Sequence, residues 1–311
     1  MEFLRLLEEI RTPLFNAIFQ FFTLFGEETL FMVFAMVFFW CVDKKSGYFL
    51  LYVSFLGGTI NQFLKLIFCI PRPWVLDKNF TIVESARDAA TGYSFPSGHT
   101  QSAVGLFLGI ARIRKEVWIR IVCVAITLLV AFSRMYLGVH TPADVLVSLG
   151  VALLLVFGAY PLFQLAWKNG KWFILLLGLL LATGVALLMY VEFVPLPANA
   201  ILESSADGAK TAYTMFGTSV GLAWVLWIEQ KYVKFSEKAV WWAQILKAAI
   251  GLGLVIAIRL LLKEPLLALC GGHNVAHAIR YFLMVAFGGA VWPLTFKFWG
   301  KLGKKKEPAK A

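Results

Sequence analysis

The sequence contains few acidic residues, few histidines and few cysteines. Its 311 residues include 18 Asp and Glu, 4 His and 4 Cys, against 29 Lys and Arg. The cysteines share no spacing typical of a metal site, and no cluster of carboxylates suited to a metal is apparent. We therefore predict chemistry without a metal or other cofactor. We interpret the cysteines as small hydrophobic residues of membrane helices, and leave open a disulfide between Cys69 and Cys270.

Long polar stretches are also scarce, because 60% of the residues are hydrophobic and the mean hydropathy is +0.76. Soluble domains contain roughly 45–50% apolar residues, so the composition indicates an integral membrane protein. The chain does not open with a short basic segment followed by a small-residue cleavage site, and we expect no removable signal peptide. Within the N-terminal segment 1–26, the residues MEFLRLLEEIR have the amphipathic pattern of a helix on the membrane surface.

The hydrophobic runs predict an all-α fold, a polytopic transmembrane helical bundle with about nine spans, since a helix needs roughly 20 apolar residues to cross the hydrocarbon core. The predicted spans are residues 27–42, 46–69, 98–111, 117–136, 142–165, 172–191, 208–229, 240–262 and 276–297. The third is short. Two pairs of glycines, Gly105 with Gly109 and Gly217 with Gly221, have the spacing that lets helices approach closely.

The net charge of +11 is spread over short loops and the C-terminal tail. The loops after the first, third, fifth and seventh spans and the tail contain Lys44, Lys45, Arg112, Arg114, Lys115, Lys168, Lys171, Lys231, Lys234, Lys238, Lys301 and Lys304 to Lys306. Basic loops of this kind face the cytoplasm, which places the N-terminus outside and the C-terminus inside. The same distribution argues against nucleic acid as a partner.

Three polar clusters fall together on the predicted outer face, where the long loop 70–97 also lies. They are Lys65 and Arg72 in KLIFCIPRP, Ser97, Gly98 and His99 in FPSGHT, and Arg134, His140 and Asp144 in SRMYLGVHTPAD. Ionisable groups beside membrane helices cost about 3 kcal/mol or more each at the bilayer centre and less near its surface. Their concentration in one place therefore indicates a functional site.

The three clusters combine groups that bind phosphate. Arginine offers a planar fork to phosphate oxygens, and lysine offers a point charge. The amides of Ser97, Gly98 and His99 lie where the third span begins, so we expect them to point at an anion with the helix dipole behind them. Gly98 lets the backbone approach such a ligand closely.

The two histidines predict a division of labour in phosphoryl transfer. Thr141 and Pro142 have the pattern of an N-cap and a first helical residue, which places Asp144 in the first turn and within reach of His140. A carboxylate bonded to Nδ1–H leaves Nε2 as an oriented nucleophile. We therefore predict His140 as the nucleophile and His99 as the general acid.

These residues resemble the three-part signature of the type 2 phosphatidic acid phosphatase (PAP2) superfamily. The matching segments are Lys65-x6-Arg72-Pro73, Pro96-Ser97-Gly98-His99 and Ser133-Arg134-x5-His140-x3-Asp144. The resemblance covers about residues 27–165. It implies that Lys65, Arg72 and Arg134 bind phosphate, assisted by Ser97 and Gly98. It also implies a phosphohistidine at His140, with Asp144 as its orienting residue and His99 as the acid.

The resemblance implies a division of the chain as well. Residues 27–191 would form the catalytic membrane domain around a PAP2-like six-helix core. Residues 192–311 would add C-terminal transmembrane helices and a basic cytoplasmic tail. Residues 166–311 contain no motif that we can assign. The expected location is a bacterial cell membrane, with the active site on the extracytoplasmic side. The oligomeric state is not specified.

Several of these residues also have simpler interpretations. Lys65 could extend its charge to the surface from a helix end, Thr141 and Asp144 could form only a capping box, and Ser133 could bond locally. A further polar group lies near the outer ends of the last two spans and comprises Arg259, Lys263, Glu264, His273, His277 and Arg280. For its arginines we favour pairing with Glu264 or Glu203 over recognition of a head group.

The function best supported by the sequence is a membrane phosphatase acting on a lipid phosphate or pyrophosphate. A lipid substrate is favoured because the site opens at the membrane surface among hydrophobic helices, where the chains of the substrate stay in the bilayer. Three alternatives stay open. They are a sugar-phosphate phosphatase, since nine spans with an outside N-terminus are similar to the glucose-6-phosphatase layout, a phosphotransferase using the same site, and a lipid transporter.

Overall fold

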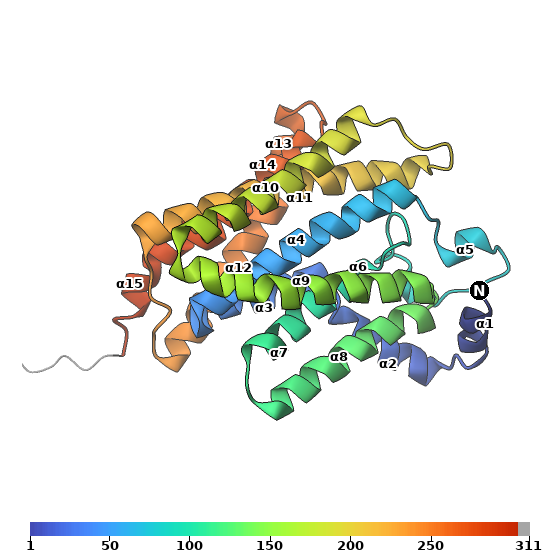
Figure 1. Cartoon of the computed structure of the whole chain (residues 1–311), viewed down its shortest axis with the longest axis horizontal. Coiled ribbons are helices and arrows are strands. Elements are labelled where there is room, and N and C mark those ends of the chain that lie inside the picture. Colours follow the sequence, from blue (N-terminus) through green and yellow to red (C-terminus); the bar gives the residue numbers. More distant parts are fainter. Residues whose placement is uncertain (304–311) are drawn as a thin grey trace, which may run out of the picture.

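The computed structural model describes residues 1–303, which form a bundle of helices and contain no β-strand. Most of the long helices run along the long axis of the molecule (Figure 1). The elements are α1 (Glu2–Glu9), α2 (Pro13–Leu24), α3 (Glu28–Val37), η1 (Phe38–Val42), α4 (Lys44–Phe68), α5 (Pro73–Leu76), η2 (Glu84–Ala86), α6 (Gly98–Ala103), η3 (Val104–Leu108), α7 (Gly109–Ile113), α8 (Val117–Tyr136), α9 (Pro142–Lys168), α10 (Gly170–Phe193), α11 (Leu202–Ile228), η4 (Glu229–Val233), α12 (Trp241–Leu261), α13 (Lys263–Leu269), α14 (Val275–Ala286), η5 (Phe287–Val291), η6 (Trp292–Thr295) and α15 (Phe296–Trp299).

Seven helical stretches are long and apolar enough to cross a membrane, and a bent pair formed by α2 with α3 and η1 would be an eighth. This confirms the all-α polytopic bundle. The predicted third span is not among the seven, because residues 98–113 divide into α6, η3 and α7, of 6, 5 and 5 residues. The predicted first span is the second arm of the bent pair, which turns by 47° after α2.

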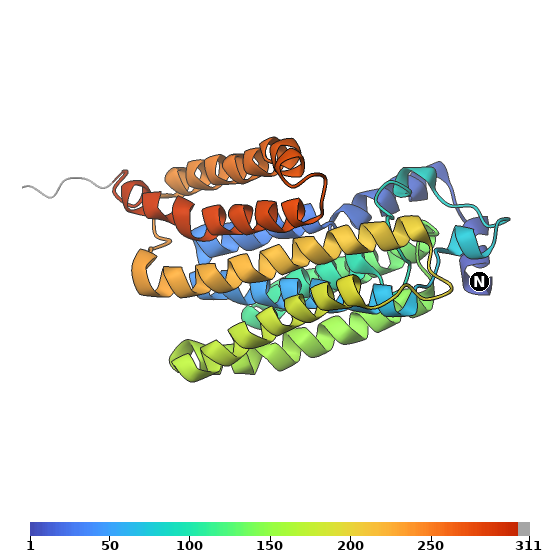
Figure 2. The same cartoon turned by 90° about the horizontal axis from the view of Figure 1, so that it is seen from above.

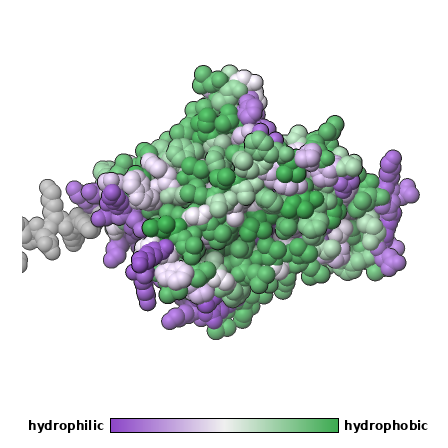
Figure 3. All heavy atoms as spheres, turned by 45° about the horizontal axis from the view of Figure 1, so that its top comes forward, coloured by the Kyte–Doolittle hydropathy of each residue, from purple (hydrophilic) through white to green (hydrophobic). Residues whose placement is uncertain are grey.

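The surface carries the pattern expected of a protein inside a bilayer. Figure 3 shows hydrophobic residues over the middle of the visible face and hydrophilic residues toward its ends. The N-terminus lies at one end of the bundle and α15 at the other (Figure 1). The basic tail residues Lys304 to Lys306 lie outside the described residues.

Helix α1 docks on the long loop between α4 and α6. Leu4 and Leu7 are buried together with Phe80 of that loop, and Arg5 forms an ion pair of 2.6 Å with Asp77. The hydrogen bond with Asn79, followed by the one with Arg5, lowers the pKa of the Asp77 carboxyl. One apolar face of the predicted surface helix therefore contacts the protein itself.

Close helix packing occurs at all four glycines of the predicted pairs. A Cβ on Gly105 would lie 2.7 Å from Ser54 Oγ, and one on Gly109 would lie 2.6 Å from Leu50 Cδ2. A Cβ on Gly217 would lie 2.1 Å from the carbonyl oxygen of Ala278, and one on Gly221 would lie 3.0 Å from Val285 Cβ. The last two glycines bring α14 against α11, which runs between α14 and α10 in Figure 2.

The cysteines are all free, so Cys69 and Cys270 do not form a disulfide. Cys69 instead ends α4 with a left-handed backbone, at a φ of 48°. Its amide donates to the carbonyl of Lys65 in the last turn of α4. The chain thus turns sharply between the two cations Lys65 and Arg72.

Candidate active site

Four segments meet at the end of the bundle that holds the N-terminus (Figure 1): the end of α4, the loop before α6, the start of α6, and the turn between α8 and α9. They enclose one side of a cavity with about 310 Å³ of free volume, called here the polar cavity. Five of the eight predicted site residues line it, namely Lys65, Arg72, Gly98, His99 and His140. The other three, Ser97, Arg134 and Asp144, do not line it.

His140 lies in the turn before α9 and is oriented by Asp144. Its Nδ1 is 3.3 Å from Asp144 Oδ2, and both side chains are only about 2% exposed. On the opposite side of the ring, Nε2 is 2.9 Å from Arg72 Nη1. A guanidinium only donates hydrogen bonds, so Nε2 must be the acceptor in this contact. The proton of the neutral imidazole is then on Nδ1 and is donated to Asp144, which leaves a lone pair on Nε2.

The surroundings of His140 favour its neutral form. Burial lowers the pKa of this imidazole well below its usual range, and the positive charges of Arg72 and Arg134 lower it further. A neutral ring at physiological pH keeps the Nε2 lone pair available for attack on phosphorus.

Asp144 also starts α9. Its Oδ2 accepts a hydrogen bond of 2.8 Å from the Thr141 amide, while Thr141 Oγ1 accepts one of 3.3 Å from the Asp144 amide. This is the capping box that the sequence suggested as a simpler interpretation. The same carboxylate oxygen accepts from Ser94 Oγ as well as from His140. Capping of the helix and contact with the histidine therefore coexist in one side chain.

Arg72 is tied to the long loop and faces the cavity. Its guanidinium donates to the carbonyl oxygens of Gly92, Thr91 and Val139, at 3.1, 2.5 and 3.0 Å. These bonds fix the orientation of the fork next to His140. The cation is buried, and its nearest partners are carbonyl groups and an imidazole rather than a carboxylate.

Arg134 is completely buried, at 0% exposure, in the last turn of α8. It donates one bond of 2.6 Å to Thr23 Oγ1, while its Nε and Nη2 have no hydrogen-bond partner. No ion pair within residues 1–303 includes this arginine. A buried cation with free donors is costly unless an anion binds nearby. Its neighbour Ser133 bonds locally to the Val130 carbonyl, in agreement with the simpler interpretation.

The start of α6 differs in one respect from the sequence prediction. Ser97 caps the helix by accepting from Thr100. Its amide, however, donates to the Asp144 carbonyl at 3.0 Å and is not free for an anion, because α6 and α9 pack together at this point. Gly98 and His99 line the cavity, and their amides occupy the first two helical positions, where an α-helix offers no acceptor.

Gly98 leads to a testable prediction, because a Cβ at this position would meet no atom within 4 Å. Gly98→Ala should fold as the native protein does, yet lower phosphate release about tenfold by placing a methyl group in the space of the ligand. Gly150→Ala is the matched control, since its Cβ also meets no atom within 4 Å and lies in α9 away from the cavity. Equal activity of the two variants would show that no ligand approaches Gly98.

Lys65 points into the site rather than toward the surface. Its ammonium group donates to the Tyr93 carbonyl, and the residue lines the polar cavity. Tyr93 in turn connects the long loop to α11, because its hydroxyl is 2.8 Å from Ser205 Oγ and accepts from the Ile201 amide at 2.9 Å. The interpretation of Lys65 as a residue extending to the membrane surface is therefore wrong.

His99 presents a buried Nε2 that has no hydrogen-bond partner. It faces the cavity from α6, whereas His140 faces it from the turn before α9. Two histidines thus reach one cavity from different elements. Among residues 1–303 no group of three His, Cys, Asp or Glu side chains is arranged to hold a metal ion.

The sequence did not indicate several residues of the site. Thr23 comes from the N-terminal segment 1–26, outside the predicted catalytic domain. Ser94 comes from the long loop, and Glu28 adds a carboxylate to the cavity lining. The second half of the chain supplies much of the remaining lining, namely Ser204, Asp207, Gly208, Lys210, Thr211, Thr214, Met215, Arg280 and Tyr281. No motif marks these positions. They reach the site because α11 packs against α4 and α14 packs against α11.

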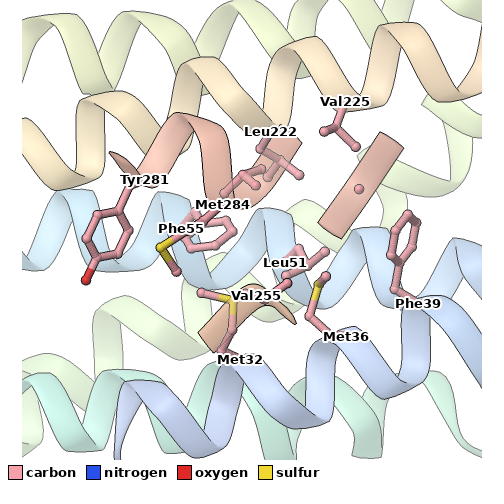
Figure 4. Close-up of a pocket in the computed structure, with 12 residues that line it drawn as sticks. Met32, Met36, Phe39, Leu51, Phe55, Leu222, Val225, Val255, Tyr281 and Met284 are labelled. Atoms are coloured by element: carbon pink, nitrogen blue, oxygen red, sulfur yellow. The ribbon is translucent and has the colours of Figure 1, made fainter. Parts of the chain in front are cut away.

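Two further cavities continue from the polar cavity toward the middle of the bundle. The first, of about 120 Å³, shares Lys65, Gly98 and Tyr281 with it and also contacts Met32 and Phe55. The second, of about 30 Å³, is lined almost entirely by apolar side chains from α3, α4, α11, α12 and α14 (Figure 4). Tyr281 lines all three cavities. The lining of the three cavities thus changes from charged to apolar side chains.

Two family models match the sequence of this chain. Residues 46–168 match the family model of the PAP2 superfamily, and residues 213–305 match the model of the PAP2 superfamily phosphatase transmembrane extension. Together the two models cover more than half of the chain.

The chain is also similar to individual proteins. It is 38% identical over 102 residues to the undecaprenyl-diphosphatase BcrC of Bacillus subtilis (strain 168), covering 32% of this chain and 49% of that protein. It is 29% identical over 160 residues to a probable sphingosine-1-phosphate phosphatase of Dictyostelium discoideum, covering 47% of this chain and 38% of that protein. The chain thus spans half or less of the length of these curated relatives.

One solved structure, that of Aquifex aeolicus LpxE, covers 50% of this chain and 91% of its own, with a TM-score of 0.45 and 24% sequence identity. The match to the superfamily model encloses all eight predicted site residues, and the match to the extension model includes α14. The chain belongs to the PAP2 superfamily, with its superfamily domain over residues 46–168 and its transmembrane extension over residues 213–305.

Proposed function

We propose that this protein is an integral membrane phosphatase that hydrolyses a lipid phosphate or pyrophosphate monoester through a phosphohistidine intermediate. The observation that carries the proposal is the placement of His140, whose Nδ1 contacts Asp144 while Nε2 is held beside Arg72 in the polar cavity. The two curated relatives are named for phosphorylated lipids, which supports this reaction class.

The phosphate binds among three cations. Lys65 and Arg72 line the cavity, and Arg134 lies behind it with two unpartnered nitrogens. The amides of Gly98 and His99 add donors at the start of α6. Bound phosphate displaces the contact between Arg72 and His140, so that a phosphate oxygen accepts from the guanidinium and Nε2 faces phosphorus. These cations neutralise the equatorial oxygens, and we expect activity to survive removal of divalent metals by a chelator.

The reaction has two steps. In the first, Nε2 of His140 attacks phosphorus, the ester P–O bond breaks, and His99 donates a proton to the departing oxygen. Asp144 stabilises the positive charge that develops on the ring of His140. In the second step His99 accepts a proton from water, the resulting hydroxide attacks phosphorus, and the N–P bond breaks. Inorganic phosphate leaves and both histidines return to their starting states.

Lipid is the proposed substrate because of what adjoins the cavity. Tyr281 lines the polar cavity and also the small cavity that Met32, Met36 and Met284 line (Figure 4), and these apolar side chains suit an alkyl chain and offer no partner to a sugar. A soluble sugar phosphate would leave these apolar walls without a ligand.

The extracytoplasmic side is proposed from the charge distribution. The polar cavity lies at the end that holds the N-terminus, whereas the basic residue Lys44 pairs with Glu229 and Lys45 bonds Gln164 near the opposite end. Positive loops remain in the cytoplasm, so the cavity faces the other side. Labelling of a cysteine introduced at Lys78 by an impermeant reagent in intact cells tests this placement, and labelling only after permeabilisation would contradict it.

The function is tested by phosphate release from the purified full-length protein in detergent. The substrates are a polyprenyl diphosphate, a polyprenyl monophosphate, phosphatidic acid and glucose 6-phosphate. We expect release from at least one lipid and none from the sugar phosphate. Preference for the sugar phosphate would refute the lipid assignment. Transport of lipid across vesicles without phosphate release would favour a transporter, and appearance of a phosphorylated alcohol acceptor would favour a phosphotransferase.

A further inference from the structure

We propose that Lys210 of α11 and Arg280 of α14 form a second anion-binding subsite in the polar cavity, which holds the phosphate that remains on the lipid after cleavage. The inference rests on the proposed function and narrows its substrate to a lipid diphosphate. The subsite belongs to the second half of the chain, where the sequence left recognition of a head group as the less favoured alternative for the arginines.

Arg280 has the properties of a residue that receives an anion. It is 7% exposed, lines the polar cavity, and its Nε is buried without a hydrogen-bond partner. Its Nη2 is 3.2 Å from His277 Nδ1, and its guanidinium lies 5.3 Å from the ring of Tyr281. A buried guanidinium remains charged and needs an opposite charge to offset its desolvation.

The pairing predicted for this arginine is absent. No ion pair within residues 1–303 includes Arg280, and Glu264 pairs with Lys263 instead, at 3.1 Å. Arg259 likewise contacts Thr29 Oγ1, at 3.5 Å, rather than a glutamate. The prediction that Glu264 or Glu203 neutralises the arginines is therefore wrong, because α13 directs Glu264 away from the cavity, with its side chain 77% exposed.

Close packing fixes the position of the subsite. The approach of α14 to α11 at Gly217 leaves no room for a side chain beside Ala278, two residues before Arg280. Helix α11 is held against α4 at Gly208, where an added Cβ would lie 2.5 Å from Leu66 Cδ2 and where Gln62 donates to the Gly208 carbonyl at 3.3 Å. Lys210 follows two residues after Gly208 on α11. Both cations are thus placed on rigid elements before a ligand arrives.

Four cations line the cavity, which is two more than the phosphate attacked by His140 contacts. Its lining contains the cations Lys65, Arg72, Lys210 and Arg280 against the carboxylates Glu28 and Asp207, besides the two histidines. Lys65 and Arg72 serve the phosphate attacked by His140, and Arg134 stands behind them. Lys210 and Arg280 remain for a second phosphate group, even with Asp207 on the same helix offsetting part of their charge.

A diphosphate uses the subsite in the reaction itself. Nε2 of His140 attacks the terminal phosphorus, and the bond to the bridging oxygen breaks. The bridging oxygen leaves as part of the lipid monophosphate and takes the electron pair, so negative charge grows on the group beside Arg280. Donors already placed there stabilise that charge in the transition state. The monophosphate then stays ionised or accepts a proton from His99.

Steady-state kinetics with two lipids of one chain length test the proposal. Arg280→Gln should lower kcat/KM for a polyprenyl diphosphate by about 10- to 100-fold, as loss of a charge-assisted hydrogen bond does. The same variant should lower kcat/KM for the monophosphate by less than about threefold. Lys210→Gln should act in the same direction. Lys263→Gln is the control, since this cation is 51% exposed and paired with Glu264. Equal losses for both lipids in Arg280→Gln would overturn the proposal.

Binding without turnover separates the subsite from the phosphatase activity. Methylenediphosphonate should raise the thermal stability of the native protein at lower concentrations than inorganic phosphate does, and Arg280→Gln should abolish the difference. Equal potency of the two anions on the native protein would overturn the subsite even if lipids are hydrolysed. If the native protein released phosphate from neither lipid, the proposed function would fail, and this comparison would still decide on the subsite.

Discussion

Replacing His140 with alanine should lower phosphate release by about 10³-fold or more, because the group that attacks phosphorus is lost. The cations and the amides at the start of α6 remain, so substrate binding should change far less than turnover. The substitution should also leave the fold intact. Asp144 keeps the Thr141 amide and Ser94 as donors when the imidazole is removed, so its carboxylate is not left without partners.

The measurement pairs steady-state phosphate release with trapping of the intermediate. Native protein mixed with a labelled substrate and quenched within the first turnover should carry an acid-labile, base-stable label, whereas His140→Ala should carry none. His273→Ala is the matched control, because His273 is exposed and bonds only to the nearby Val275 amide, at 3.2 Å. Full activity of His140→Ala, or the same label on it, would show the proposed nucleophile to be wrong.

The long membrane helices could be predicted from hydrophobicity alone where a continuous apolar run is bounded by turn formers. The spans predicted at 117–136, 142–165 and 172–191 correspond to α8, α9 and α10 with small differences at their ends. The prediction was less accurate where packing decides the outcome. The span predicted at 98–111 is divided by the π-helical turn η3. Helix α2 packs on α8 although it belongs to the N-terminal segment 1–26, outside the predicted catalytic domain.

The part of the site carried by the three signature segments could also be predicted, since the residues within each segment lie close together in sequence. Helix α9 starts at Pro142 as expected, which places Asp144 next to His140. The contacts of Thr23 with Arg134 and of Ser94 with Asp144 join segments separated by up to 111 residues, and nothing in the sequence marks them. Such pairs arise from the packing of helices that no local pattern specifies.

The contribution of the second half of the chain was open for the same reason. The sequence indicated only that Arg280 is a cation within an apolar stretch and therefore needs a partner. A hydrophobic pattern indicates how deep a residue lies in the membrane but not the direction in which its side chain faces. For Arg280, an ion pair with the nearest glutamate was therefore the simplest assumption. The direction is set by Gly217 and Gly221, which bring α14 against α11 and turn Arg280 toward the cavity.

Replacing Asp144 with asparagine should lower phosphate release by about 10²- to 10⁴-fold, because the imidazole of His140 loses the carboxylate that orients it and stabilises its charge. Oδ2 alone accepts from the Thr141 amide, Ser94 and His140, so a single atom of the new amide takes its place. Where that atom is the oxygen, the ring of His140 keeps its tautomer but loses the negative charge that stabilises its protonated form. Where it is the NH₂ group, the Thr141 amide loses its acceptor, Nδ1 becomes the acceptor and the ring proton moves to Nε2. The lone pair that attacks phosphorus is then lost, although every heavy atom keeps its place.

The capping role of Asp144 provides a competing explanation of such a loss, and Thr141→Ala distinguishes the two. This variant removes the bond of 3.3 Å from the Asp144 amide to Thr141 Oγ1 while leaving the contact between Asp144 and His140. Loss of an N-cap side chain destabilises by about 1 kcal/mol. Thr141→Ala should therefore unfold at a lower temperature and keep near-native turnover per folded molecule, whereas Asp144→Asn should lose turnover per folded molecule. If both variants lost stability equally and kept their turnover, Asp144 would serve α9 alone, and another group would have to orient His140.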